Sequence, residues 1–236
     1  MPRSLPAPTP VECDGARPAV DRGTITHVFF DNDGILVDTE HLYYEASHQV
    51  LAARGIELTE AEYIELFLRQ NRGLLHFGEV HGWTTRELAD LRTRRDSVYA
   101  DLLGRGGLVI DGVEDALAAL AGRVRMAIVT STRPDHFAVA HRDAGLLKYF
   151  DFVLASGDYS ESKPHPAPYL AALARADASP DTCLVVEDSE RGLRSALAAG
   201  LRCVVIPSRR TRGERFEGAL RVLDSVRDLV GLVETG

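Results

Sequence analysis

The sequence has few lysines, few cysteines and no long apolar run. Only Lys148 and Lys163 are lysines, so arginine supplies nearly all of the positive charge. The three cysteines, Cys13, Cys183 and Cys203, form no C-x-x-C pair, and their odd number argues against a disulfide framework. We therefore expect reduced thiols and a cytoplasmic location. No apolar stretch approaches the roughly 20 residues that a membrane span requires, so we expect no membrane partner.

Basic residues are outnumbered by acidic residues, and the formal net charge is −8. An acidic protein repels a phosphate backbone, so we expect no nucleic-acid partner, whereas a small phosphorylated ligand stays possible. The 236 residues suffice for one large domain or a domain with an insertion. Residues 1–24 are rich in Pro, Ala and Gly and have no apolar core of the secretory type, so we expect a disordered arm.

Strand-like runs alternate with helical periodicity along most of the chain. The strands are expected at residues 25–30, 125–129, 152–154, 183–186 and 203–206. Such alternation predicts an α/β fold with a parallel sheet that is covered on both faces. The interval 39–108 is the exception, because it has helical patterns and no convincing strand. A capping box at Thr84 and Glu87 there predicts a helix through Tyr99, and Pro134, after Thr132 as its cap, predicts another helix start.

Two acids, Asp31 and Asp33, follow the first apolar run, with Gly34 next to them. Residues i and i+2 of a strand project to the same side, and ligands of open parallel sheets bind beyond the carboxyl ends of the strands. Two close carboxylates need a neutralising cation, or one of them keeps its proton. They could therefore hold Mg²⁺, attack phosphorus and protonate a leaving group. An ordinary Asp-Asn-Asp-Gly turn is the alternative interpretation.

Three further polar groups follow other strand-like runs. Thr130-Ser131-Thr132 offers hydroxyl and backbone N–H groups to an anion, and Glu187-Asp188 is a second acidic pair suited to Mg²⁺. Lys163 lies in a loop between these strands. Because arginine is the usual surface cation here, a lysine indicates a compact ammonium that neutralises phosphate oxygens and a carboxylate together. A solvated surface lysine is the alternative.

Together these motifs resemble the haloacid dehalogenase-like hydrolase superfamily, in particular its β-phosphoglucomutase and phosphoglycolate phosphatase branch. The resemblance rests on four ordered motifs: 31-DNDGILVD-38, Thr130-Ser131, 163-KPHPAPY-169 and 187-EDSERG-192. It implies a Rossmann-like parallel core formed by residues 25–38 and 109–236, and an all-helical cap at 39–108 that closes over the site.

The resemblance also implies a role for each matched residue. Asp31 would be the nucleophile that forms an aspartyl-phosphate, and Asp33 the general acid and then base. Thr130, Ser131 and Lys163 would bind the phosphoryl group. The cofactor Mg²⁺ would be held by Asp31, the backbone carbonyl of Asp33 and Asp188, with Glu187 close by or acting through water.

Two polar groups in the helical interval leave open questions. Arg69, Arg72 and His76 share a helical face by spacing and could bind a second anionic group of the substrate, or simply form a solvated face. Leu68 departs from the Gly that relatives often carry before an Arg, so the substrate is not assigned. Asp38, His41 and His48 fit a polar hinge better than a metal cluster; the alternative of a metal cluster stays open.

The predicted function is a Mg²⁺-dependent phosphatase of a small phosphorylated metabolite, with a sugar phosphate favoured, in a monomer or weak homodimer. A phosphosugar mutase using the same residues is the alternative, since the motifs do not say whether water or a substrate hydroxyl receives the phosphoryl group. A phosphorylation-dependent signalling domain combines similar residues on a parallel sheet, but it needs no long helical insertion after its first strand.

Overall fold

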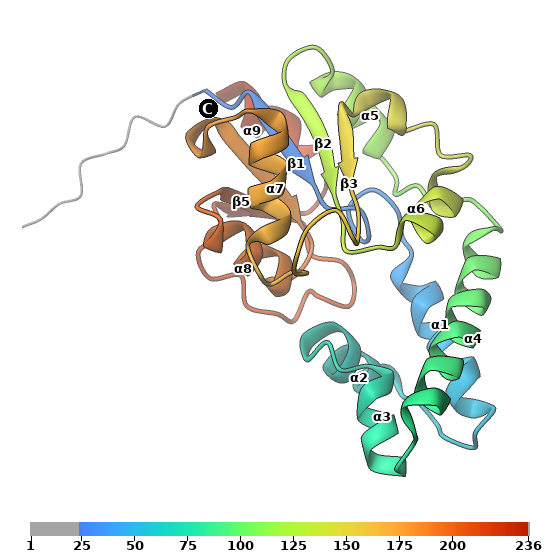
Figure 1. Ribbon diagram of the computed structural model, residues 1–236. Helices are drawn as coiled ribbons and strands as arrows, with labels where there is room; N and C mark the ends of the chain where they lie inside the picture. The colour runs from blue at the N-terminus through green and yellow to red at the C-terminus, as the bar shows by residue number, and fades with distance from the viewer. Residues whose placement is uncertain (1–23, 236) are drawn as a thin grey trace, which may run out of the picture.

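The computed structural model describes residues 24–235 and contains a parallel sheet in the order β3-β2-β1-β4-β5-β6 (Figure 1). The strands are β1 (His27–Phe30), β2 (Arg125–Val129), β3 (Phe152–Leu154), β4 (Cys183–Glu187), β5 (Arg202–Val205) and β6 (Arg221–Val222). This confirms the predicted α/β fold and its five strands. The two-residue, exposed β6 was not predicted. Residues 1–23 of the expected arm lie outside the described residues.

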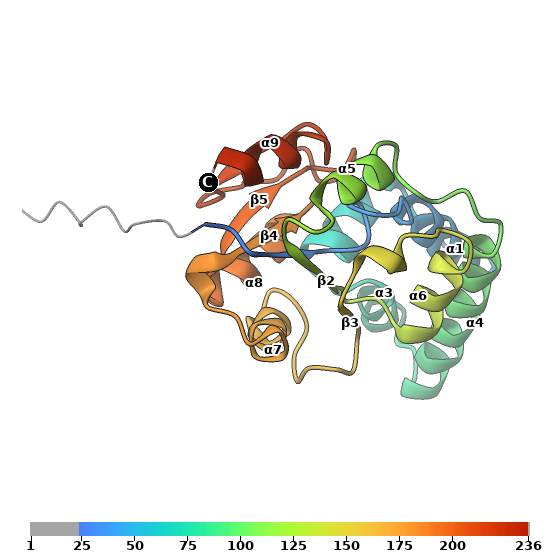
Figure 2. The ribbon, with the colours of Figure 1, turned by 90° about the horizontal axis from the view of Figure 1, so that it is seen from above.

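Successive residues of the central strands enter two different apolar layers. Val28 and Phe30 of β1 belong to one layer, and Phe29 between them belongs to the other. Both layers are buried, which explains why the strands are continuous apolar runs instead of alternating ones. Figure 2 shows α5 (Val113–Leu120) and α9 (Asp228–Thr235) on one side of the sheet, and α7 (Ala167–Ala176) and α8 (Glu190–Ala198) on the other.

The interval after β1 is helical in the structure. It contains α1 (Glu40–Ala52), α2 (Glu60–Tyr63), the π-helix η1 (Ile64–Arg69), α3 (Leu74–His81) and α4 (Thr85–Leu103). A separate cluster of buried apolar side chains, from Val50 to Leu91, packs among these helices. They extend from one end of the sheet, beyond the ends of its strands (Figure 1). In the described part of the chain, no helix is long and apolar enough to cross a membrane.

One predicted helix start is confirmed and one is wrong in its cap. The Thr84 hydroxyl accepts from the Glu87 N–H, and the Glu87 carboxylate accepts from the Thr84 N–H, so the predicted box opens α4. Pro134 does begin α6 (Pro134–His141), but Arg133 is the cap residue, without a side-chain bond. The Thr132 hydroxyl donates to Asp33 instead, because the stronger carboxylate acceptor is within reach. Short 3₁₀ turns, η2 (Leu147–Tyr149) and η3 (Pro180–Thr182), complete the fold.

Candidate functional site

The predicted site residues meet at the carboxyl edge of the sheet. Asp31 follows β1, Thr130 follows β2, and Asp188 follows β4, while Lys163 comes from the loop after β3. All neighbouring strands are parallel, so these ends lie along one edge. Strand order reverses its direction between β1 and β4, and such a switch point is where open α/β sheets bind ligands. A cavity of about 410 Å³ opens there, between the sheet edge and the helices α1 and α4.

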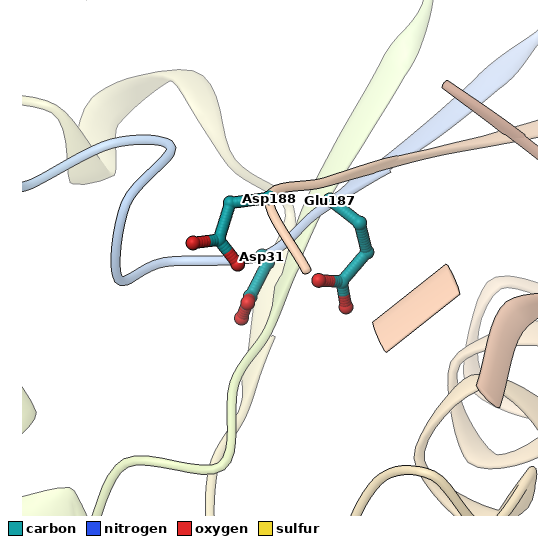
Figure 3. A group of neighbouring side chains, drawn as sticks. All are labelled: Asp31, Glu187 and Asp188. Atoms are coloured by element: carbon teal, nitrogen blue, oxygen red, sulfur yellow. The ribbon is translucent and has the colours of Figure 1, made fainter. Parts of the chain in front are cut away.

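Three acids form the centre of the site. Asp31, Glu187 and Asp188 each offer an oxygen within 4.8 Å of the others (Figure 3). Burial is the main cause that raises the pKa of Asp31 to about 6, and repulsion from Glu187 is the second. Burial, together with the neighbouring acids, also raises the pKa of Asp188 well above its usual value. Close, buried carboxylates with raised pKa values favour a bound cation, because a cation allows all of them to ionise.

Lys163 supplies the positive charge inside this group. Its ammonium lies 2.9 Å from an Asp31 oxygen and 2.7 Å from a Glu187 oxygen, and it donates to the carbonyl of Val129 at 2.8 Å. Its side chain is 3% exposed, so the alternative of a solvated surface lysine is wrong. Burial alone would lower the pKa of Lys163, but attraction by Asp31 and Glu187 outweighs it and raises the pKa.

Glu187 faces Lys163 and does not line the cavity. The Tyr169 hydroxyl donates to one Glu187 oxygen at 2.6 Å, and the other oxygen is buried with no hydrogen-bond partner in the described structure. A Cβ atom on Gly192 would fall 1.9 Å from this carboxylate. The glycine of the 187-EDSERG-192 motif is therefore needed because the Glu187 carboxylate occupies the space of a side chain.

Hydroxyl groups surround Asp33. Thr39 and Thr132 donate to its two carboxylate oxygens, and the Thr130 hydroxyl lies 3.4 Å from one of them. Ser131 and Thr132 line the cavity, whereas Thr130 is fully buried and is not part of the cavity wall. Sequence reasoning did not assign Thr39 and Thr132 to the site, although Thr132 belongs to the Thr-Ser-Thr run that was noticed.

The two predicted cap arginines are separated by the structure. Arg72 lines the cavity and pairs with Glu79, whereas Arg69 pairs with Glu65 at 3.3 Å and is not part of the cavity wall. Further arginines that the sequence did not single out line the same cavity: Arg92, Arg95, Arg133 and Arg191.

An ion-pair network joins the helical segment to the sheet edge. Asp96 of α4 accepts from Arg95 at 2.7 Å and from Arg133, which follows β2, at 3.1 Å. Arg95 also lies over the ring of Tyr43, 4.7 Å from its centroid. Glu40, another residue that the sequence did not single out, lines the cavity, and burial raises its pKa to about 7. This wall is thus rich in groups that can bind anions and hydroxyls.

The polar residues at the start of α1 do not converge. His41 lies 3.3 Å from Asp38, and both are well exposed. His48 lies against Tyr44 instead, with 6.0 Å between the ring centroids. Within residues 24–235, the group close enough for a metal is the acidic trio at the sheet edge.

The comparisons with known proteins identify the family. A family model described as haloacid dehalogenase-like hydrolase matches residues 28–206. The chain belongs to this family. This haloacid dehalogenase-like hydrolase is 33% identical over 227 residues to protein CbbY of Cereibacter sphaeroides, covering 88% of this chain and 95% of that protein.

Other relatives of this hydrolase carry phosphatase names. The phosphorylated carbohydrates phosphatase of Thermotoga maritima is 29% identical over 214 residues, covering 89% of this chain and 90% of the relative. The crystal structure of a CbbY variant from Rhodobacter sphaeroides, in complex with xylulose-1,5-bisphosphate, superposes with a TM-score of 0.76 at 31% identity, covering 87% and 96% of the two chains. These relatives support the expected phosphoric monoester hydrolase acting on phosphorylated metabolites.

Proposed function

We propose that the protein is a Mg²⁺-dependent phosphatase of a small phosphorylated sugar and works through an aspartyl-phosphate intermediate. The observation that carries this proposal is the contact of Lys163 with Asp31, 2.9 Å apart at the base of the cavity. A lysine in this place neutralises phosphoryl oxygens and keeps Asp31 ionised for attack.

The residues present fit a magnesium ion. Mg²⁺ prefers oxygen ligands from one or two carboxylates together with phosphate and water. Asp31 and Asp188 line the cavity and each offers a carboxylate oxygen within 4.8 Å of the other. The backbone carbonyl of Asp33, which also lines the cavity, would be the third ligand. When bound, the ion would neutralise the charge of the phosphoryl group. Glu187 contributes by holding Lys163, at 2.7 Å.

The chain's own groups divide the work of two successive displacements. The Asp31 carboxylate attacks phosphorus while Asp33 gives a proton to the leaving oxygen; Asp33 then takes a proton from the water that hydrolyses the aspartyl-phosphate. Lys163 and the Ser131 N–H, at the cavity wall, bind the phosphoryl oxygens, and the Thr130 hydroxyl, which in the free protein is buried 3.4 Å from Asp33, is proposed to join them when the substrate is bound. The hydroxyls of Thr39 and Thr132, which donate to Asp33, orient its carboxylate in the free protein.

Residues 39–108 act in this proposal as a cap that covers the substrate. The cavity is lined from the helical segment by Tyr43, Arg72 and Arg95, and from the sheet edge by Asp31 and Lys163. Arginine binds phosphate with paired donors, so the arginine-lined wall suits a second anionic group on the sugar. The relative that binds xylulose-1,5-bisphosphate supports a sugar bisphosphate as one substrate to test.

The experiment that tests the proposal is a screen of phosphate release. The purified protein is incubated with Mg²⁺ and a panel of hexose 1-phosphates, hexose 6-phosphates, pentose bisphosphates and phosphoglycolate, and inorganic phosphate is measured. We expect release from at least one sugar phosphate and none after chelation of divalent ions. Formation of the 6-phosphate from a hexose 1-phosphate without free phosphate would establish the mutase instead.

Magnesium is expected to stabilise the protein in a pH-dependent way. The pKa of Asp31 is about 6 in the folded protein and about 4 in an unfolded chain. The folded protein therefore binds the Asp31 proton more tightly, and this contribution to the free energy of unfolding is complete below about pH 4 and is lost as the pH rises through 6. A cation that binds the ionised acids restores stability above pH 6. Saturating Mg²⁺ should therefore raise Tm by roughly 5–10 °C at pH 7.5 and much less at pH 5.

The matched control for this measurement is sodium chloride at the same ionic strength. Asp188→Asn should remove the magnesium effect, whereas Asp38→Asn, an exposed acid in the loop after β1, should keep it. An equal rise of Tm at both pH values, or in Asp188→Asn, would show that the ion binds elsewhere.

A further inference from the structure

A buried polar pair lies directly behind the two acids of the first strand end. Asn32, between Asp31 and Asp33, is fully buried, and its side-chain oxygen lies 2.6 Å from Nε2 of His141 in α6. His141 is itself 4% exposed and stacks on Phe137, 4.3 Å between ring centroids. Burial lowers the pKa of His141 to about 4, so the imidazole is neutral at pH 7 and Nε2 is the donor to the amide oxygen.

The pair lowers the stability of the folded protein, because it leaves buried polar atoms unpaired. Within the described structure, Nδ2 of Asn32 and Nδ1 of His141 are buried and have no hydrogen-bond partner. An unmade hydrogen bond of a buried group costs stability, and an apolar pair of similar shape would avoid that cost. Asn32 and His141 are therefore poorly explained as packing residues.

Asn32 is also the residue about which the acidic loop turns. Its carbonyl accepts from the N–H groups of Ile35, Leu36 and Val37 at 3.3, 2.8 and 3.2 Å, and its own N–H bonds to the Asp31 carboxylate. A change in the orientation of the Asn32 side chain would be passed through this turn to Asp33, whereas Asp31 is held separately by Lys163 at 2.9 Å.

His141 ties this loop to the segment that holds Asp33 from the other side. Helix α6 begins two residues after Thr132, whose hydroxyl donates to Asp33. The loop after β1 and the segment after β2 are thus joined in two places, around Asp33 by Thr130 and Thr132, and in the core by Asn32 and His141. Two separate ties fix both the position and the orientation of the Asp33 carboxylate.

We propose that the hydrogen bond between Asn32 and His141 positions Asp33 for proton transfer to the leaving group. The inference rests on the proposed function, because it takes Asp33 as the general acid. Asn32 and His141 are positioning residues and do not line the cavity. Their removal should lower kcat/KM, which reports phosphoryl transfer to Asp31, for substrates whose leaving oxygen needs a proton, and should spare kcat/KM for substrates whose leaving group departs as a stable anion.

The test compares two substrates in His141→Leu and in the double variant Asn32→Leu, His141→Leu. Leucine has the branched shape of asparagine, and at position 141 it is shorter than histidine. This leaves room for the 3.5–4.0 Å that carbon atoms need in place of a 2.6 Å hydrogen bond. For an alkyl phosphate, kcat/KM should fall about tenfold in both variants, as expected for a misplaced catalytic group. For p-nitrophenyl phosphate it should stay within about twofold of the wild type.

Three further measurements separate positioning from stability. The double variant should recover the Tm lost by His141→Leu, because it leaves neither polar group unpaired, yet stay impaired on the alkyl phosphate. His141→Gln, whose amide can donate to the same oxygen, should restore kcat/KM. The inhibition constant of inorganic phosphate should be unchanged throughout, since Lys163 and Ser131 are untouched.

The results distinguish failure of the inference from failure of the function. If the wild-type protein releases phosphate from both substrates and the double variant keeps full activity on the alkyl phosphate, the positioning role alone is overturned. An equal loss on both substrates would overturn it as well. A wild-type protein that releases phosphate from neither substrate, with Mg²⁺ present, would overturn the proposed function and this inference together.

Discussion

Replacing Asp31 by asparagine is expected to reduce phosphate release by on the order of 10⁴- to 10⁶-fold while the protein stays folded. The amide has nearly the same shape but cannot attack phosphorus. The protein should still fold, because the ionised Asp31 carboxylate itself destabilises the folded state. Burial and repulsion from Glu187 raise its pKa to about 6. The loss of this repulsion offsets part of the lost contact with Lys163. Phosphate release and thermal unfolding, measured on the same preparation, check both parts.

Asp38→Asn is the matched control, since it makes the same chemical change seven residues later in an exposed side chain that contacts His41. It should keep phosphate release within a few-fold of the wild type. Residual activity of Asp31→Asn above a hundredth of the wild type would contradict the assignment of Asp31 as nucleophile.

Replacing Lys163 by methionine should be costly for both activity and stability. The change leaves Asp31 and Glu187 buried without their counter-charge, and removing one partner of a buried ion pair costs about 3–5 kcal/mol. The loss should be largest above pH 6, where Asp31 ionises, and should shrink toward pH 5 as Asp31 takes up a proton. Activity should fall by about 10²- to 10³-fold, the usual effect of losing one donor to a developing charge.

Lys148→Met provides the comparison within the same chain, because Lys148 is the other lysine and its side chain is 58% exposed beside Glu114. An exposed ion pair contributes little, so its loss should leave Tm and activity nearly unchanged. Denaturant unfolding at pH 5 and pH 8 gives the free energies. Equal stability of Lys163→Met and Lys148→Met at pH 8 would show that the buried ammonium is not needed to hold the acids together.

Much of the site was predictable because parallel strands carry their ends to one edge. Asp31, Thr130 and Asp188 each follow an apolar run, and the rule that ligands bind at the carboxyl edge brings them together without coordinates. Lys163 was predictable for a different reason, since it is one of only two lysines in a chain whose other basic residues are arginines and histidines. The structure places its ammonium between two acids, as a compact charge allows.

The arginine-lined wall was not predictable in the same way. Arg69 and Arg72 lie three residues apart in one short segment, yet only Arg72 lines the cavity, because a π-helix ends at Arg69 and the chain then turns through Asn71 at φ 52°. Periodicity rules assume a regular helix, which ends between the two residues. Arg95 and Arg133 come from distant segments, and both pair with Asp96.

The sequence by itself determined the parallel sheet, its order of acids, hydroxyls and lysine, and the long helical insertion, because these follow from local patterns and from the direction of strands. Tertiary structure alone decided the orientation of side chains. It turned Glu187 toward Tyr169 and Lys163, directed the Thr132 hydroxyl to Asp33, and paired Asn32 with His141 across 109 residues of chain. Such contacts depend on packing between segments that are remote in sequence, and no local pattern encodes the direction of a buried side chain.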